Sequence, residues 1–230
     1  MIQARLRSVF DTIERICQKI GRDPRDIVLV GATKYSSESD IRDAIEGGMT
    51  HIGESKVQAA REKFSQLQDV LPRVTKHMIG HLQTNKVKTA LELFDMIQSV
   101  DSVKLIREIE KQAARSQRAK IDILLEVNIS GEAQKFGIEK GNLFTLVEEV
   151  QMCQRIRLLG LMTMAPLSDD QGIIRQCFRS LKDVSEEIND HFCIEDKVEM
   201  RYLSMGMTHD YEIALEEGAN MLRIGSAIFG

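Results

Sequence analysis

The residue with the clearest chemical potential is Lys34, which closes the apolar segment Val30-Gly-Ala-Thr-Lys34. In a strand its side chain would share a face with Val28, Val30 and Ala32, so its amine would follow an apolar row. An amine at an apolar mouth loses hydration, which disfavours the ammonium form and lets it act as a nucleophile or form a Schiff base. The alternative is a lysine that leaves the strand and points into water.

Two segments near the C-terminus have the composition of a phosphate site. Ser204-Met-Gly206-Met-Thr208 follows one apolar run, and Gly225-Ser226 follows the last one. Small hydroxyls and backbone N–H groups in loops of this kind bind phosphate, and glycine lets the backbone approach the anion closely. Since Gly and Ser also form ordinary turns, the prediction depends on both segments occurring together.

A third candidate is Arg223, which lies inside the last apolar run, just before Gly225. A guanidinium buried without a partner is costly, so Arg223 must find acceptors. Two interpretations are open. Arg223 forms a structural ion pair with Glu54 or Glu126, or it donates to an acceptor atom of a ligand.

The elements that must position these residues are eight short apolar runs, which we interpret as strands. The runs from Ile27 to Val30 and from Ile121 to Val127 are almost continuously hydrophobic, as is typical of parallel strands covered on both faces. The strands are expected at Ile27–Lys34, Thr50–Gly53, Lys76–Gly80, Met96–Val100, Asp122–Asn128, Arg157–Thr163, Arg201–Met205 and Met221–Gly225.

Amphipathic segments alternate with these runs. Helices are expected at about residues 3 to 20 and at Ser39–Gly47, Ser102–Ser116 and Gln171–Asp190. Capping residues that would start helices are Ser37, Ser55, Asp101 and Asp210, and residues that would end them are Gly47 and Gly218.

Eight strand-then-helix units predict an α/β fold, a (β/α)₈ TIM barrel preceded by an extra N-terminal helix. The alternative is a doubly wound open sheet, which usually has fewer strands. In both folds the active site lies at the C-terminal ends of the strands, which is where Lys34, Ser204 and Gly225 stand. No linker-like stretch interrupts the chain, so residues 1–230 are expected to form one domain.

Composition excludes several classes of function. Lys and Arg number 31 against 35 Asp and Glu, a net charge of -4, so there is no basic surplus for nucleic acid or an anionic membrane. The four cysteines have no C-x-x-C spacing, and neither His77 nor His81 has companions at metal-site spacing, so both are expected to be core or loop histidines. Without a signal segment, a cytosolic protein is expected.

Several collinear motifs identify a resemblance. The sequence from about Ile27 to Gly230 resembles the pyridoxal phosphate homeostasis protein family, whose fold is similar to the barrel domain of alanine racemase. Chain segments that carry the resemblance are Ala-Thr-Lys at 32–34, His-Ile-Gly-Glu at 51–54, Lys-His-Met-Ile-Gly-His-Leu-Gln-Thr-Asn-Lys at 76–86, Ser-Val-Asp-Ser at 99–102, Glu-Val-Asn-Ile-Ser-Gly-Glu at 126–132, Gly-Leu-Met-Thr-Met at 160–164, Leu-Ser-Met-Gly-Met-Thr at 203–208 and Arg-Ile-Gly-Ser-Ala-Ile-Phe-Gly at 223–230.

The resemblance implies a cofactor and a set of contacts. Pyridoxal 5′-phosphate (PLP) would be held as an internal aldimine on Lys34, and Arg223 would face its pyridine nitrogen. The phosphate would be held by Ser204, Gly206, Thr208, Gly225 and Ser226. The chain departs from the family where Gly-Glu-Asn-Tyr is usual, since it has Ser55 and Lys56 after Gly53-Glu54, and it has Ser226 where threonine is common.

Three functions compete at this point. The resemblance implies a protein that stores, buffers or delivers PLP, with apo PLP-dependent enzymes as partners. An amino-acid racemase is the alternative, and a Schiff-base aldolase or phosphosugar isomerase without PLP is a third. Racemisation needs proton transfer on both faces of the substrate, and Lys34 is the one clear base. Racemases of this fold also add a C-terminal β domain, which we expect this chain to lack. A monomeric carrier is therefore expected.

Overall fold

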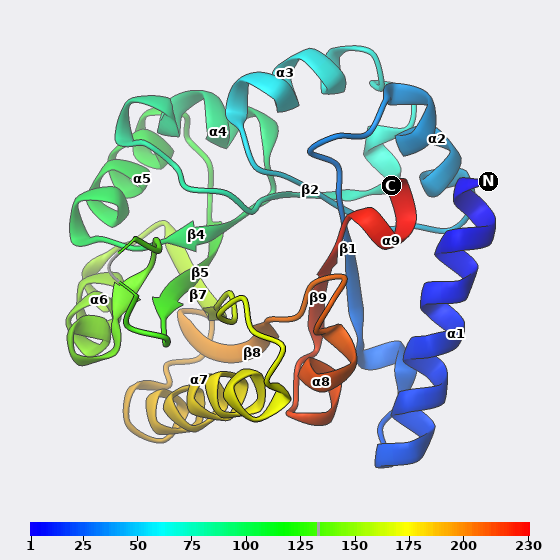
Figure 1. The fold of residues 1–230 in the computed structure, drawn as a ribbon. Coiled ribbons are helices and arrows are strands. Elements are labelled where there is room, and N and C mark those ends of the chain that lie inside the picture. The colour runs from blue at the N-terminus through cyan, green and yellow to red at the C-terminus, as the bar shows by residue number, and fades with distance from the viewer. Residues whose placement is uncertain (133) are drawn as a thin grey trace.

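A closed ring of eight parallel strands forms the centre of the molecule. The computed structural model describes residues 1–132 and 134–230. The strands follow the order β4-β3-β2-β1-β9-β8-β7-β5, and β4 also pairs with β5, which closes the ring (Figure 1). The predicted (β/α)₈ barrel is confirmed, and the open doubly wound sheet is wrong.

The observed strands lie within one to three residues of the predicted ones. They are β1 (Val28–Ala32), β2 (His51–Glu54), β3 (Thr75–Met78), β4 (Met96–Val100), β5 (Ile121–Asn128), β7 (Ile156–Met162), β8 (Val198–Ser204) and β9 (Met221–Ile224). The sequence pattern missed β6 (Ile138–Glu139), which pairs with the end of β5 outside the ring. A two-residue strand is too short to show a period.

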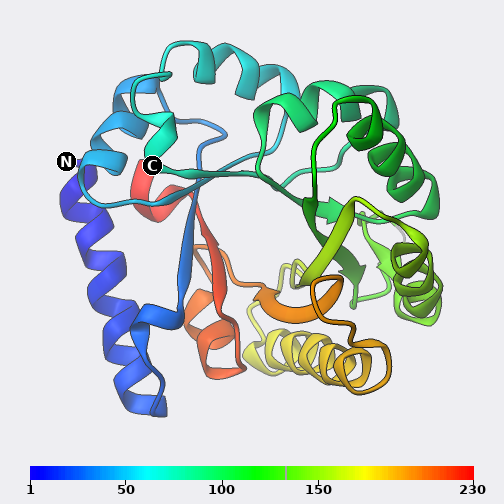
Figure 2. The same cartoon turned by 180° about the vertical axis from the view of Figure 1, so that it is seen from behind.

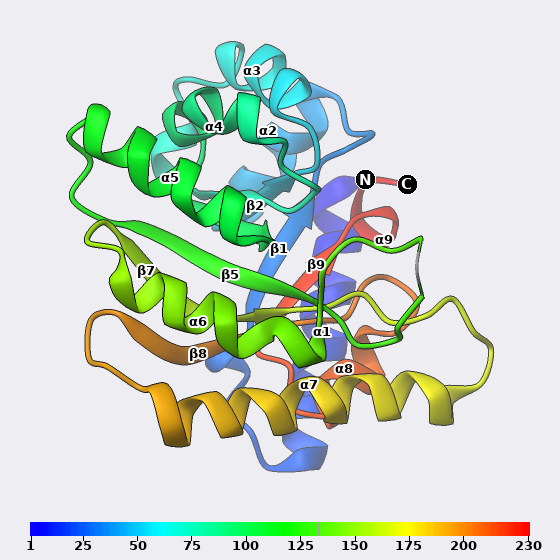
Figure 3. The same cartoon turned by 90° about the vertical axis from the view of Figure 1, so that its left-hand side faces the viewer.

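A layer of helices surrounds the strands, as the view from behind also shows (Figure 2). Helices that the sequence delimited are α1 (Ile2–Ile20), α2 (Glu38–Glu46), α5 (Val103–Arg115) and α7 (Gln171–Phe192). The helices that it did not delimit are α3 (Val57–Ser65), α4 (Val87–Leu93), α6 (Leu143–Met152), α8 (Tyr211–Glu216) and α9 (Ser226–Phe229). From the side, α5, α6 and α7 cover the outer face of β5, β7 and β8 (Figure 3).

The predicted helix caps are only partly correct. Ser37 caps α2 through a capping box with Asp40, and Gly47 ends that helix. Ser55 does not cap α3, which begins after Lys56, and α5 is capped by Ser102 rather than Asp101. The predicted caps of α8, at Asp210 and Gly218, also differ in part from the observed ones. Asp210 stands at the start of α8, but its carboxylate binds the backbone N–H of Met207, and Gly218 follows the last cap residue by one position.

Two apolar clusters make up the core. The larger one fills the space between strands and helices. The smaller one lies inside the ring and consists of Val30, Met96, Leu124, Leu159, Met162 and Met221. Polar side chains share the ring interior with this cluster, among them His77, Gln98, Ser204 and Arg223, each at most 4% exposed.

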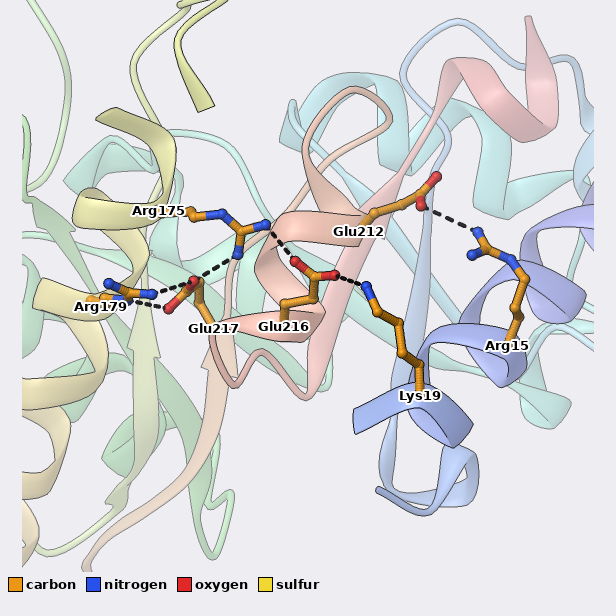
Figure 4. A network of polar contacts seen from close by, with 7 residues as sticks. All are labelled: Arg15, Lys19, Arg175, Arg179, Glu212, Glu216 and Glu217. Carbon is orange, nitrogen blue, oxygen red and sulfur yellow. Dashed lines mark hydrogen bonds and ion pairs between the residues drawn. The ribbon is translucent and has the colours of Figure 1, made fainter. Parts of the chain in front are cut away.

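An ion-pair network anchors α8 between α7 and α1 (Figure 4). Glu216 and Glu217, at the end of α8, accept from two arginines of α7, and Glu216 also pairs with a lysine of α1. Glu212 pairs with a further arginine of α1. The cations are Arg15, Lys19, Arg175 and Arg179. These contacts hold in place the loop that precedes α8, where the predicted phosphate segment lies.

Candidate functional site

Lys34 stands just beyond the end of β1, beside the loop that follows β9. In the parallel pairing of β1 and β9, Val30 lies opposite Arg223. A Cβ built on Gly225 would be 3.3 Å from the carbonyl oxygen of Ala32, so the backbone at Gly225 runs close against β1. The barrel thus brings the lysine and the 225–226 segment to the same mouth, as predicted from their positions at the C-terminal ends of two strands.

The amine of Lys34 is open to solvent. The residue is exposed, and Nζ lies 4.8 Å from the ring centroid of Tyr35, which is 88% exposed. The hydrogen bond from Lys34 lowers the pKa of the Tyr35 phenol. Of the two alternatives that the sequence left open, the structure shows the lysine that leaves the strand, since β1 ends at Ala32 and Lys34 is exposed.

Two hydroxyl groups from different loops meet at this mouth. Thr208 Oγ1 and Ser226 Oγ are 3.1 Å apart, and the backbone N–H of Ala227 donates to Thr208 Oγ1 over 3.3 Å. Thr208 is half-buried and Ser226 is exposed, so both can exchange this contact for a ligand. The arrangement unites two halves of the predicted phosphate site that are 18 residues apart in sequence.

The backbone around Gly206 holds the Thr208 loop in a fixed shape. Gly206 has a φ of +95°, and a Cβ there would be 2.7 Å from the Cβ of Ala214 on α8. Its carbonyl accepts the N–H of Arg223 over 3.0 Å. Asp210 closes the loop by accepting the N–H of Met207 over 2.6 Å. Glycine is therefore required at position 206 by both conformation and packing.

Arg223 is buried inside the ring, at 4% exposure. Its two terminal nitrogens donate to Ser204 Oγ over 2.7 Å and to the carbonyl of Thr163 over 2.8 Å. Burial lowers the pKa of Arg223 to about 10, against the opposing effect of Glu126 and Asp210, so the guanidinium is charged at neutral pH. Neither predicted ion pair is present among the described residues; both acceptors are uncharged.

Ser204 lies deeper than the sequence suggested. It is fully buried, and its hydroxyl donates to Gln98 Oε1 over 2.6 Å while accepting from Arg223. Both functions of the hydroxyl are therefore used within the barrel. The contact between Ser204 and the phosphate stays a prediction.

A buried ion pair that the sequence analysis missed holds the Lys34 segment. Lys63 Nζ on α3 lies 2.9 Å from Glu54 Oε2, and the same ammonium donates to the carbonyls of Thr33 and Lys34. The Lys63 side chain is 14% exposed and that of Glu54 is 1% exposed. No pattern in the sequence links position 63 to position 34, because α3 approaches β1 only in the folded barrel.

Other titratable groups surround the mouth. Burial raises the pKa of Glu126, on β5, to about 7, although the charge of Arg223 lowers it. His81 Nδ1 is 3.2 Å from Asp101 Oδ2, and its ring stacks on Phe136 at 4.2 Å. His81 is a loop histidine, as expected. Within residues 1–132 and 134–230, no group of three or more His, Cys, Asp or Glu side chains could hold a metal ion.

Comparisons with known proteins place the chain in a family. The alanine racemase N-terminal domain profile matches residues 11–230. The pyridoxal phosphate homeostasis protein of Aquifex aeolicus is 37% identical over 98% of this chain and 96% of its own length. That of Escherichia coli K12 is 32% identical over 98% and 94%. The chain belongs to the pyridoxal phosphate homeostasis protein family. The resemblance seen in the motifs is confirmed.

Solved structures agree with this placement. PipY of Synechococcus elongatus PCC7942, a structure with PLP bound, is 30% identical with a TM-score of 0.83, covering 95% of this chain and 100% of PipY. An alanine racemase of Clostridium difficile 630 is 12% identical with a TM-score of 0.70, and the match covers 99% of this chain but 56% of the racemase. The racemase shares the barrel fold.

The structure also shows where Ser55 lies, the position at which the sequence motif differs from the one expected of the family. The Ser55 N–H donates to Glu54 Oε1 over 2.8 Å, and a Cβ on Gly80 would be 2.4 Å from the Ser55 carbonyl. The backbone of position 55 is thus fixed between β2 and the loop after β3. In the described part of this family member, no helix is long and apolar enough to span a membrane.

The Lys63–Glu54 pair predicts a coupled loss of stability at the Lys34 segment. Lys63→Met leaves a buried carboxylate without its cation and should lower the free energy of unfolding by about 3 kcal/mol. The double variant Lys63→Met/Glu54→Gln should recover part of that loss. Chemical denaturation measures both, and hydrogen exchange at the amides of Thr33 and Ser36 should accelerate in the single variant.

The matched control is Lys182→Met on α7, whose ammonium forms an exposed pair with Glu186. Its loss should stay within about 0.5 kcal/mol. Equal losses in Lys63→Met and Lys182→Met would show that the buried pair does not hold the segment.

Proposed function

We propose that this protein binds PLP covalently through Lys34 and serves to store, buffer or deliver the cofactor. The observation that carries the proposal is the meeting of Lys34 with the Thr208–Ser226 hydroxyl pair at one mouth, in a chain whose relative PipY has a structure with PLP bound. A primary amine reacts with the aldehyde of PLP, and hydroxyl donors suit its phosphate.

The residues present fit the phosphate group. Thr208 and Ser226 offer two accessible hydroxyls, and Gly206 and Gly225 keep their backbones close against neighbouring elements without a side chain in the way. We assign the phosphate to these four residues. Ser204, which was predicted among them, supports Arg223 through its hydroxyl instead.

Arg223 argues for a carrier over a racemase. PLP supplies an electron sink for amino-acid chemistry, and the sink is strong when its pyridine nitrogen is protonated. We propose that the guanidinium of Arg223 faces that nitrogen. Since it is a fixed cation held by Ser204 and the Thr163 carbonyl, it opposes protonation by like-charge repulsion. The residues of this chain therefore bind PLP better than they activate it.

The remaining parts of the proposal concern partners and location. We propose that apo PLP-dependent enzymes receive the cofactor, that the protein acts as a monomer and that it works in the cytoplasm. The cytoplasmic location is supported by four cysteines without a redox or metal spacing in the sequence.

The first prediction tests the covalent link. After incubation with PLP and borohydride reduction, peptide mass mapping should find a pyridoxyl group on the peptide that contains Lys34. Lys34→Ala should abolish the adduct and the covalent absorbance, whereas Lys56→Ala, which removes an exposed lysine nearby, should retain both. An adduct on Lys56 or Lys86 in the wild-type protein would refute the assignment.

The second prediction tests the phosphate contacts. Loss of one hydrogen bond to a charged group costs about 1.5–3 kcal/mol, so Ser226→Ala should weaken PLP binding about tenfold or more. Binding of pyridoxal, which has no phosphate, should be much weaker in the wild type and insensitive to this change. Ser65→Ala on α3 is the control. Equal affinities of the wild-type protein for PLP and pyridoxal, measured by titration, would contradict the site.

The third prediction separates carrier from racemase. The PLP-loaded protein, incubated with L-alanine in deuterated water, should show Cα exchange near background by NMR, because Arg223 disfavours the protonated ring. The same preparation should restore activity to an apo PLP enzyme. Rapid exchange with inversion, lost in Lys34→Ala, would establish a racemase.

A further inference from the structure

A continuous chain of hydrogen bonds runs through the barrel interior from Arg223 to the β2 strand. Beyond Ser204 it passes to Gln98, whose Nε2 lies 2.9 Å from His77 Nδ1. His77 Nε2 in turn lies 2.9 Å from His51 Nδ1. Gln98, His77 and Ser204 are fully buried, and His51 is half-buried at the start of β2.

The hydrogen bonds in this chain can point in only one direction. The Arg223 guanidinium has donors and no acceptor, so Ser204 Oγ must accept from it and pass its own hydrogen to Gln98 Oε1. The Gln98 amide then donates to His77 Nδ1, which requires the Nε2–H tautomer of His77. That Nε2–H donates to His51 Nδ1. Reversing the Gln98 amide would leave the Ser204 hydroxyl hydrogen with no acceptor in the chain.

The rest of the environment agrees with this direction. Gln98 Nε2 also lies 3.2 Å from Met221 Sδ, so the second N–H of this buried amide has an acceptor too. Burial, with the neighbouring charges of His51 and Lys76, lowers the pKa of His77 to about 3, and burial lowers that of His51. The His77 ring is therefore neutral at physiological pH, as the chain requires.

We propose that Gln98, His77 and His51 are positioning residues, which hold the Ser204 hydroxyl in one orientation and thereby fix the Arg223 guanidinium at the cofactor ring. The proposal rests on the proposed PLP site. Without the chain, Ser204 could rotate and Arg223 would lose the fixed direction of its NH1 bond. The barrel interior is thus organised for one cation.

The first test needs no cofactor. In the protein without PLP, long-range ¹H–¹⁵N NMR correlations identify the tautomer of each histidine, with the exposed His191 of α7 as the reference signal. We expect His77 to be a neutral Nε2–H tautomer across pH 5 to 8, and its signals to change in Ser204→Ala. An Nδ1–H tautomer of His77 would overturn the proposal, whether or not PLP binds.

The second test compares two substitutions at His77 in the PLP-loaded protein. The side-chain oxygen of Asn can take the place of Nδ1 as acceptor for Gln98, whereas Leu offers none. We expect His77→Leu to raise the PLP dissociation constant about tenfold, which is the effect of losing one hydrogen bond from the charged Arg223 to the cofactor. His77→Asn should stay within about threefold of wild type. His191→Leu is the surface control.

The absorption band of bound PLP distinguishes positioning from packing. The pH midpoint of the visible absorption band of bound PLP should rise in His77→Leu, because a loosened Arg223 opposes ring protonation less, and should stay unchanged in His77→Asn. A His77→Leu protein with wild-type affinity and band would overturn the proposal.

Discussion

Burial of the Arg223 guanidinium is the constraint on which the inside of this barrel depends. The guanidinium only donates hydrogen bonds, so burying it is costly unless neighbouring oxygen atoms accept from its N–H groups. The structure meets this need with the Ser204 hydroxyl and the Thr163 carbonyl, while the carboxylate of Glu54 pairs with Lys63. As a consequence, polar side chains occupy part of the ring interior, where barrels of this type usually pack branched apolar ones.

Much of the architecture was predictable because it depends on local patterns. The apolar runs marked all eight strands of the ring, since strands buried on both faces need nearly continuous hydrophobicity. Lys34, Thr208 and Ser226 were recognisable because strand ends of a barrel share one face. The capping errors at Ser55 and Asp101 are shifts of a single residue: α5 is capped by the adjacent Ser102, and α3 begins after Lys56 without a side-chain cap.

What could not be predicted depends on contacts between distant segments. Lys63 lies on a helix that shows nothing unusual, and only the folded chain brings its ammonium to the carbonyls before and at Lys34. Ser204 looked like a phosphate ligand because it stands at a strand end beside Gly206. The alternation of side chains along a strand does not predict whether a side chain at the strand end points toward the mouth or into the ring. His77 showed no signal, because a single buried histidine has the same pattern whether or not it supports a site.

Helix α1 is not one of the repeated units of the barrel, yet it contacts α8 and α9, which follow the two loops proposed to bind the phosphate. Its cations pair with α8, and Arg5 donates to the carbonyl of Gly230 just after α9, where the two chain ends lie side by side (Figures 1 and 3). Helix α1 therefore links α8 and α9, the two helices that follow β8 and β9. A substitution that removes these contacts of α1 would therefore act on α8 and α9 together, the helices that follow the two loops proposed to bind the phosphate.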